Sequence, residues 1–299
     1  MYTSSLKNSK MPYFLSKIIV GTMRWGQWGE GMTTNKRSQL IQMAYDLGMR
    51  CFDHADIYGN YTTEKDFGMA FKATKLPRDK VQYISKCGIA MVCENKQYKT
   101  KHYKYDAKYI IESVHTSLRQ LNTSYIDIQL LHRPSPLMHP EEIMKAVEHL
   151  IKSGKILSFG VSNFSQSQMS LLQKYLPVSV NQMETSLTHH NSMFNGTLDY
   201  CMEHDILPMA WAPLALLKQP IDKWPTKLAS ALDILCEKHN TTLAPLLIAW
   251  LIRHPAQIHP VIGTTKPERL KEISTAIDIH LDEEDWFFLL EAVNEKQCP

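Results

Sequence analysis

The chain has 299 residues, of which 44% are hydrophobic and 21% are charged. These shares are ordinary for a globular protein, and the length is sufficient for one α/β barrel, a fold of about 250 residues. A formal net charge of +3, from 33 basic and 30 acidic residues, is too small to indicate a nucleic-acid-binding surface. We therefore expect no nucleic-acid partner.

The sequence gives no sign of a membrane span or a secretory signal. Residues 4–10 are polar, whereas a signal peptide has an apolar run near its start. The longest apolar stretch, residues 243–252, contains Pro245 and is shorter than the roughly 20 residues that a membrane span needs. These features predict a soluble, cytoplasmic protein with no membrane partner.

The cysteine and histidine pattern indicates neither a disulfide framework nor a metal site. The six cysteines, which form no C-x-x-C pair, are Cys51, Cys87, Cys93, Cys201, Cys236 and Cys298. We expect reduced thiols, as in other cytosolic enzymes. His189 and His190 are adjacent, but neighbouring side chains rarely converge on one ion, so no metal is expected.

Short β-branched or apolar runs recur along the chain with helical patterns between them, an alternation that is typical of a parallel sheet. The predicted strands are Ile18–Gly21, Cys51–His54, Gln82–Lys86, Ile126–Leu131, Ser158–Val161, Ser179–Gln182, Leu207–Trp211 and Ile258–Ile262. Eight strands of this kind indicate a closed (β/α)8 barrel, or TIM barrel.

The intervening segments predict more helices than strands. These helices are Lys36–Leu47, Thr63–Ala73, Ala107–Leu121, Pro140–Lys152, Ser165–Lys174, Asn195–His204, Leu228–His239, Ala244–Ile252, Pro267–Ala276 and Glu283–Asn294. The barrel should therefore carry additional helices near its C-terminus. No Pro/Gly/Ser-rich linker divides the chain, so we expect residues 1–299 to form one domain.

A basic cluster with interleaved tyrosines precedes the third long helix. It comprises Lys96, Lys99, Lys101, Lys104 and Lys108, with Tyr98, Tyr103 and Tyr105 between them. Runs of like charge usually face water, so a solvated loop is the favoured interpretation.

Four side chains that carry protons or charges lie at, or just after, the carboxyl ends of predicted strands. They are Asp53, Tyr58, Lys86 and His132. Functional groups of (β/α)8 barrels gather at these strand ends, so we expect the four to share one mouth of the barrel. Taken singly, a turn tyrosine, a surface lysine or a backbone-bound histidine is the commoner interpretation. Their convergence favours a catalytic site.

The chemistry of this set suits protonation of an alkoxide as it forms. A phenol has an ordinary pKa of about 10, and a neighbouring ammonium favours the phenolate. We therefore expect Lys86 to lower the pKa of Tyr58, and Asp53 to pair with Lys86. His132 can donate a hydrogen bond to a carbonyl oxygen and polarise it. The set predicts reduction of a small-molecule carbonyl substrate.

Segments spread through nearly the whole chain resemble the aldo-keto reductases, which are (β/α)8-barrel, NAD(P)H-dependent oxidoreductases. They are IVGTMRWG at residues 19–26, FDHADIYG at 52–59, GVSNF at 160–164, NQME at 181–184, AWAPLA at 210–215 and VIGTTKPER at 261–269. The resemblance implies that Asp53, Tyr58, Lys86 and His132 are the catalytic tetrad of this family, with Tyr58 as general acid.

The resemblance also implies a bound NADPH. Ser162, Asn163 and Gln182 would hold the nicotinamide carboxamide, because their amide and hydroxyl groups suit an amide partner. The remaining implied cofactor contacts are Trp211 stacked on the nicotinamide ring, Ala212, Pro213 and Leu214 near the pyrophosphate, and Gly263, Thr264, Thr265, Arg269 and Glu272 at the adenosine end. Gly263 stands where many family members have a lysine, which predicts a moderate NADPH preference carried mainly by Arg269. Trp25, Trp28 and Tyr61 are predicted to form an apolar wall for the substrate.

Two other functions share parts of this pattern. Relatives with the same fold bind nicotinamide as non-catalytic, redox-sensing subunits, and fold alone does not separate these from enzymes. A barrel lyase would use Lys86 in a Schiff base, but its lysine must be free of a carboxylate partner, and Asp53 argues against that. No heptad pattern is present, so a monomer or a small homo-oligomer is expected.

Overall fold

The centre of the protein, seen in a computed structural model that describes residues 15–297, is a closed barrel of parallel strands. Its strands, in the order in which they pair, are β1 (Ile19–Gly21), β10 (His259–Ile262), β9 (Leu207–Trp211), β8 (Val180–Glu184), β7 (Ile156–Ser162), β6 (Ile126–Leu131), β3 (Gln82–Cys87) and β2 (Cys51–Asp53). Each strand of the barrel overlaps a predicted one. The predicted (β/α)8 fold is therefore confirmed.

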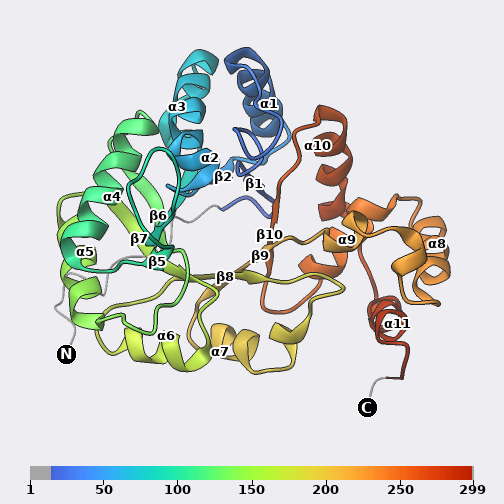
Figure 1. Ribbon diagram of the computed structural model, residues 1–299. Coiled ribbons are helices and arrows are strands. Elements are labelled where there is room, and N and C mark those ends of the chain that lie inside the picture. Colours follow the sequence, from blue (N-terminus) through green and yellow to red (C-terminus); the bar gives the residue numbers. More distant parts are fainter. Residues whose placement is uncertain (1–14, 298–299) are drawn as a thin grey trace.

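Helices surround the barrel (Figure 1). They are α1 (Thr34–Asp46), α3 (Thr63–Thr74), α4 (Ala107–Gln120), α5 (Pro140–Lys152), α6 (Gln166–Gln173), α7 (Thr197–Glu203), α8 (Leu228–Lys238), α9 (Leu243–Ile252), α10 (Pro267–Ser274) and α11 (Glu283–Asn294). The connection from β9 to β10 contains both α8 and α9, and α11 packs against α8. These are the additional helices that the sequence predicts near the C-terminus.

The strands read as continuous apolar runs because both of their faces are buried. Inside the barrel, side chains such as Ile19, Ile84 and Met209 form one buried cluster. Outside it, residues such as Phe52 and Val161 pack against the helices in a second, larger core. The sheet is thus tightly packed on both faces, and the loops at the carboxyl ends of its strands start from this packed barrel.

The basic segment forms part of a small antiparallel pair, so the prediction of a simple loop is corrected. Strand β4 (Ile89–Ala90) pairs with β5 (His102–Tyr103), next to the end of β3. Gly88 permits this turn: its φ is +109°, and a Cβ there would lie 1.8 Å from the ring of Tyr105. The lysines of the segment are exposed, as predicted.

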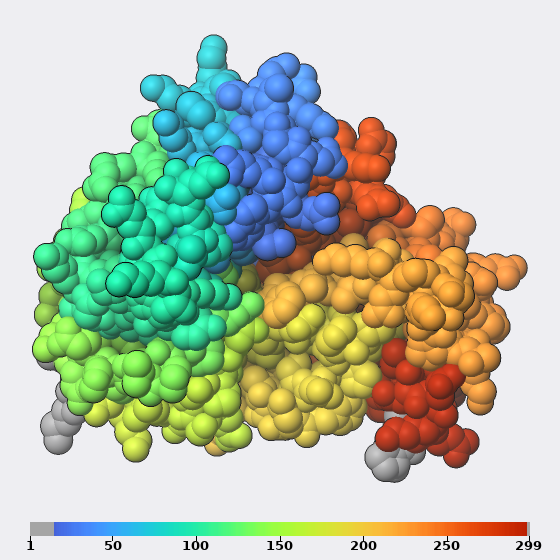
Figure 2. Space-filling model, viewed as in Figure 1, coloured from blue at the N-terminus to red at the C-terminus, as the bar shows by residue number. Residues whose placement is uncertain are grey.

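Segments from distant parts of the sequence meet around the centre of one face of the molecule, where blue, teal, yellow and orange parts of the chain adjoin (Figure 2). No helix within residues 15–297 is long and apolar enough to cross a membrane. The cysteines in that range are free thiols, whereas the polar run at residues 4–10 and Cys298 lie outside it.

Candidate active site

Lys86 is the centre of the predicted tetrad. It lies one residue before the end of β3 at Cys87, is 1% exposed, and donates hydrogen bonds of 2.7 Å to both carboxylate oxygens of Asp53. Its Nζ atom also lies 2.8 Å from the carbonyl oxygen of His54 and 3.2 Å from the phenol oxygen of Tyr58. A buried ammonium is costly unless it is paired, and these contacts satisfy it.

The charge of Lys86 is secured by its partners. Burial is the largest influence on this ammonium and lowers its pKa, but the charges of Asp53 and Tyr58 and their hydrogen bonds together raise the pKa above its ordinary value. Lys86 is therefore a cation at neutral pH. It is also locked to a carboxylate, which opposes its use as a Schiff-base nucleophile.

Tyr58 begins α2 (Tyr58–Tyr61), a single turn that is the next element after β2. Gly59 and Asn60 both have a φ of 56°, which breaks the regular helix and turns the chain sharply after Tyr58. Burial raises the pKa of Tyr58, and this effect exceeds the lowering by Lys86. The predicted lowering by Lys86 is present, but burial outweighs it and makes the net shift of the pKa upward, and spacing along the chain does not show how deeply the phenol is buried. At neutral pH Tyr58 is a protonated phenol, the form that a general acid requires.

His132 follows β6 and faces Tyr58 across the site. Its backbone amide donates to the carbonyl oxygen of Cys87 at 2.9 Å, and its ring centroid lies 6.0 Å from that of Tyr58, edge to face. Burial, followed by the charge of Lys86, holds the pKa of His132 well below its ordinary value. The neutral imidazole has one N–H to donate, and Nδ1 has no partner among the described residues.

The residues predicted to hold the carboxamide form one hydrogen-bonded group. Ser162 at the end of β7 pairs with Gln182 on β8, and the amide of Asn163 donates to Ser162 Oγ at 2.7 Å. Trp211 Nε1 donates to Asn163 Oδ1 at 2.9 Å. Gln182 Nε2 donates to Asp53 Oδ1 at 3.0 Å, which connects this group directly to the tetrad.

This donor set fits a nicotinamide. Amide and hydroxyl groups of Ser162, Asn163 and Gln182 offer both donors and acceptors, as an amide ligand needs. The indole of Trp211 stands at the carboxyl end of β9, where an aromatic ring is placed for a ligand. Ala212, Pro213 and Leu214 follow directly, and Ala212 has a positive φ of 51°.

Arg133 is a member of the site that sequence reasoning missed. Its Nη1 donates to the carbonyl oxygen of His132 at 3.2 Å and to Ser162 Oγ at 3.4 Å, and its guanidinium lies 5.5 Å over the ring of Trp211. Arg133 thus connects His132 of the tetrad to Ser162 and Trp211, two residues of the predicted nicotinamide-binding group. The available signal was its position immediately after His132 at a strand end.

The predicted adenosine end follows β10. Gly263 and Arg269 are exposed, and the guanidinium of Arg269 makes no hydrogen bond or ion pair with any residue between 15 and 297. Thr265 is 8% exposed and donates to Glu30. Glu272 accepts a hydrogen bond from Thr242, the residue directly before α9.

Two of the three predicted wall residues lie beside Tyr58. The ring of Trp28 lies 6.1 Å from that of Tyr58, edge to face, and its Nε1 donates to Asn60 Oδ1 at 3.1 Å. Tyr61 is half-buried, and its hydroxyl donates to the carbonyl oxygen of Ile89 at 3.1 Å. Trp25 corrects the prediction: at 1% exposed it packs in the core against Phe67 rather than on a pocket wall.

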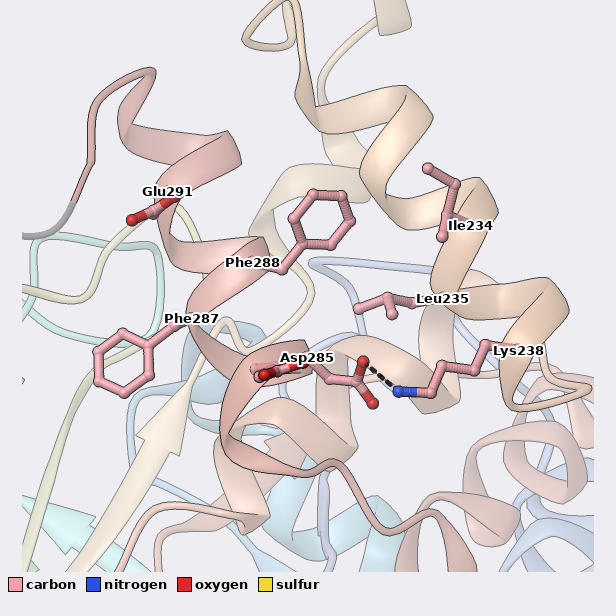
Figure 3. A pocket seen from close by; sticks show the side chains of 8 residues that line it. Ile234, Leu235, Lys238, Asp285, Phe287, Phe288 and Glu291 are labelled. Carbon is pink, nitrogen blue, oxygen red and sulfur yellow. Dashed lines mark hydrogen bonds and ion pairs between the residues drawn. The ribbon is translucent and has the colours of Figure 1, made fainter.

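A surface groove between α8 and α11 is separate from this site (Figure 3). Phe288 of α11 faces Ile234 and Leu235 of α8, and Lys238 Nζ donates to Asp285 Oδ1 at 2.7 Å. None of the predicted site residues lines it.

Comparison with known proteins agrees with this fold. The model of the Aldo/keto reductase family matches residues 17–293. The chain is 38% identical to the uncharacterized oxidoreductase YcsN of Bacillus subtilis over 95% of this chain and 96% of the relative. It is 37% identical to a 6-dehydroglucose reductase of Agrobacterium fabrum over 92% and 93% of the two chains.

A solved aldo/keto reductase of Klebsiella pneumoniae, in complex with NADP and acetate, superimposes with a TM-score of 0.76 at 25% identity, over 93% of this chain and 91% of that chain. The family match and the oxidoreductase-named relatives together support an enzyme of the NAD(P)H-dependent oxidoreductase class. The chain belongs to the aldo/keto reductase family.

Proposed function

We propose that this protein is an NADPH-dependent reductase that converts aldehydes or ketones to alcohols, with Tyr58 as general acid. The observation that supports this most directly is the position of Lys86, whose Nζ lies 2.7 Å from Asp53 and 3.2 Å from Tyr58. This pairing places a fixed cation beside a protonated phenol, which is the arrangement that proton donation to an alkoxide needs.

Each side chain then has one task. His132, neutral and buried, donates a hydrogen bond to the substrate oxygen and polarises the carbonyl. Tyr58 gives its proton to the same oxygen as negative charge develops there, and Lys86 stabilises the phenolate that remains. Asp53 keeps the ammonium in position. NADPH, when bound, would supply the hydride that adds to the carbonyl carbon.

The proposed cofactor contacts begin with Ser162, Asn163 and Gln182, which would bind the carboxamide and so orient one ring face toward the substrate. Trp211 would stack on the ring. Arg269 supports NADPH at the other end, because its guanidinium is exposed and has no ion-pair partner within the described part of the chain. Such a guanidinium can bind a ribose 2′-phosphate through paired hydrogen bonds.

The substrate class that we propose includes oxidised sugars. A relative 37% identical to this chain is a 6-dehydroglucose reductase, and a second protein of that name, from Novosphingobium aromaticivorans, is 30% identical. Sugar-derived aldehydes and ketones therefore belong in the first set of substrates to be tested. The apolar neighbours Trp28 and Tyr61 also favour aromatic aldehydes.

The test is a screen of NADPH oxidation by the purified protein against aldehydes, ketones and oxidised sugars. Turnover of at least one carbonyl compound, lost in the Tyr58→Phe variant, is expected. A protein that binds NADPH but reduces none of the panel would instead be a nicotinamide-binding, redox-sensing subunit. Stable mass on Lys86 after borohydride treatment with a carbonyl compound would identify a lyase.

A further inference from the structure

The connection between β1 and α1 reaches across to the connection between β10 and α10. The two lie side by side because β1 pairs with β10 in the barrel. Thr265 Oγ1 donates a hydrogen bond of 2.6 Å to Glu30 Oε1, and Trp25 Nε1 donates one of 3.3 Å to the carbonyl oxygen of Thr264. These two hydrogen bonds connect the loop that contains Glu30 to the predicted adenosine end of the cofactor site.

The side chain of Glu30 is a negatively charged group at the predicted adenosine end of the cofactor site. Its second oxygen accepts a hydrogen bond of 3.2 Å from Lys36 Nζ. The hydrogen bond from Thr265, followed by that from Lys36, lowers the pKa of Glu30, so the side chain is a carboxylate at neutral pH. Thr265 is one of the residues predicted to contact the adenosine end of the cofactor. In the structure its hydroxyl already binds an anion that belongs to the protein.

A fixed carboxylate has opposite effects on the two nicotinamide cofactors. A ribose 2′-phosphate is repelled by a nearby negative charge, and the repulsion is not fully screened over a few ångströms. A ribose 2′-hydroxyl can instead donate a hydrogen bond to a carboxylate, which is how acidic residues select NAD in dinucleotide-binding folds. Arg269 acts in the other direction, since it attracts the phosphate.

We propose that Glu30 is a cofactor-specificity residue that opposes Arg269: it disfavours the 2′-phosphate, accepts from the 2′-hydroxyl, and so brings the affinity for NADH closer to that for NADPH. This inference rests on the proposed function, because it requires the adenosine ribose to lie against residues 263–269. It assigns a role to the β1–α1 loop that no cofactor motif in the sequence includes.

The test is to titrate NADPH and NADH into the parent and into Glu30→Gln, with fluorescence quenching as the readout. Glutamine keeps an oxygen that can accept from Thr265 Oγ1, removes the charge, and replaces the oxygen that accepts from Lys36 Nζ with an amide NH2 group. Glu112→Gln is the matched control, since Glu112 is an exposed residue of α4, far along the chain from both loops. It makes the same change in net charge.

We expect Glu30→Gln to tighten NADPH binding by roughly three- to tenfold, leave NADH binding unchanged or weaker, and show a smaller gain at high salt. The control should change neither. An unchanged ratio of the two dissociation constants, or an equal shift of both, overturns the role of Glu30 while leaving the proposed function intact. A parent protein that binds neither cofactor overturns the proposed function itself.

Discussion

The ammonium of Lys86 lies 3.2 Å from the phenol oxygen of Tyr58. Two opposing influences meet at this contact, because burial raises the pKa of Tyr58 and the ammonium lowers it. Burial is the larger of the two, so the phenol is protonated before reaction. The ammonium becomes important when the proton leaves, since it then faces a phenolate.

Lys86→Met should therefore shift the acid's apparent pKa further upward. With the cation removed, the phenolate loses its closest stabilising charge, and turnover should fall by about 10²-fold or more. The measurement is the pH profile of kcat for parent and variant. Coincident profiles would show that Lys86 does not assist Tyr58.

A second variant separates catalysis from stability in that experiment. Lys86→Met leaves the carboxylate of Asp53 buried and unpaired, a change that typically costs about 3–5 kcal/mol of stability. The double variant Asp53→Asn with Lys86→Met removes both charges. It should recover much of the thermal stability and none of the turnover, and recovery of both would assign the pair a structural role only.

Arg269→Met should weaken NADPH binding and leave NADH binding nearly unchanged. Charge-assisted hydrogen bonds contribute about 1.5–3 kcal/mol, which corresponds to a loss on the order of tenfold to a hundredfold. Fluorescence titration of both cofactors is the measurement, and Lys271→Met, an exposed cation on the same helix, is the control. Equal losses for the two cofactors would mean that Arg269 supports the adenine or the fold instead.

Two buried carboxyl groups behind the tetrad predict a pH-dependent stability. Burial, followed by the charge of Glu64, raises the pKa of Asp56 to about 8, and burial raises the pKa of Glu64 to about 7. Asp56 Oδ2 accepts from Ser113 at 2.9 Å and Glu64 Oε1 accepts from Ser85 at 2.6 Å, while the other oxygen of each carboxyl has no partner within residues 15–297.

Because these two groups hold protons more tightly in the folded chain than in the unfolded one, their contribution to stability is complete below about pH 4 and declines as the pH rises through 7 and 8. Each group adds a slope of up to about 1.4 kcal/mol per pH unit to the free energy of unfolding. Denaturant titrations between these limits should show the decline. Asp56→Asn and Glu64→Gln should each flatten it, and a parent curve that rises toward pH 8 would contradict the assignment.

The sequence was sufficient to predict the barrel, because strands that are buried on both faces are rich in apolar residues and are easily recognised. Ile126–Leu131 has four apolar residues among six, with one acidic and one amide residue between them, and the structure has the same bounds. The tetrad was found in the same way, since strand ends in this fold meet at one mouth. To place Asp53, Lys86 and His132 at this mouth, it was enough to predict the strands that carry or precede them.

Other features depend on three-dimensional surroundings that spacing does not contain. The direction of the pKa shift at Tyr58 depends on depth of burial, and Trp25 is indistinguishable in sequence from a pocket tryptophan. The bond between Thr265 and Glu30 joins residues 235 positions apart. Strands β4 and β5 have two residues each, too few to produce a periodic pattern.

The most direct test of the whole account is the turnover of Tyr58→Phe. Phenylalanine keeps the ring, which packs near Trp28 and His132, and removes only the hydroxyl that contacts Lys86. NADPH-dependent reduction of an aldehyde or sugar substrate should fall by about 10²–10⁴-fold, with the NADPH dissociation constant changed by less than about threefold. A variant that reduces the same substrate at the parental rate would show that Tyr58 is not the proton donor.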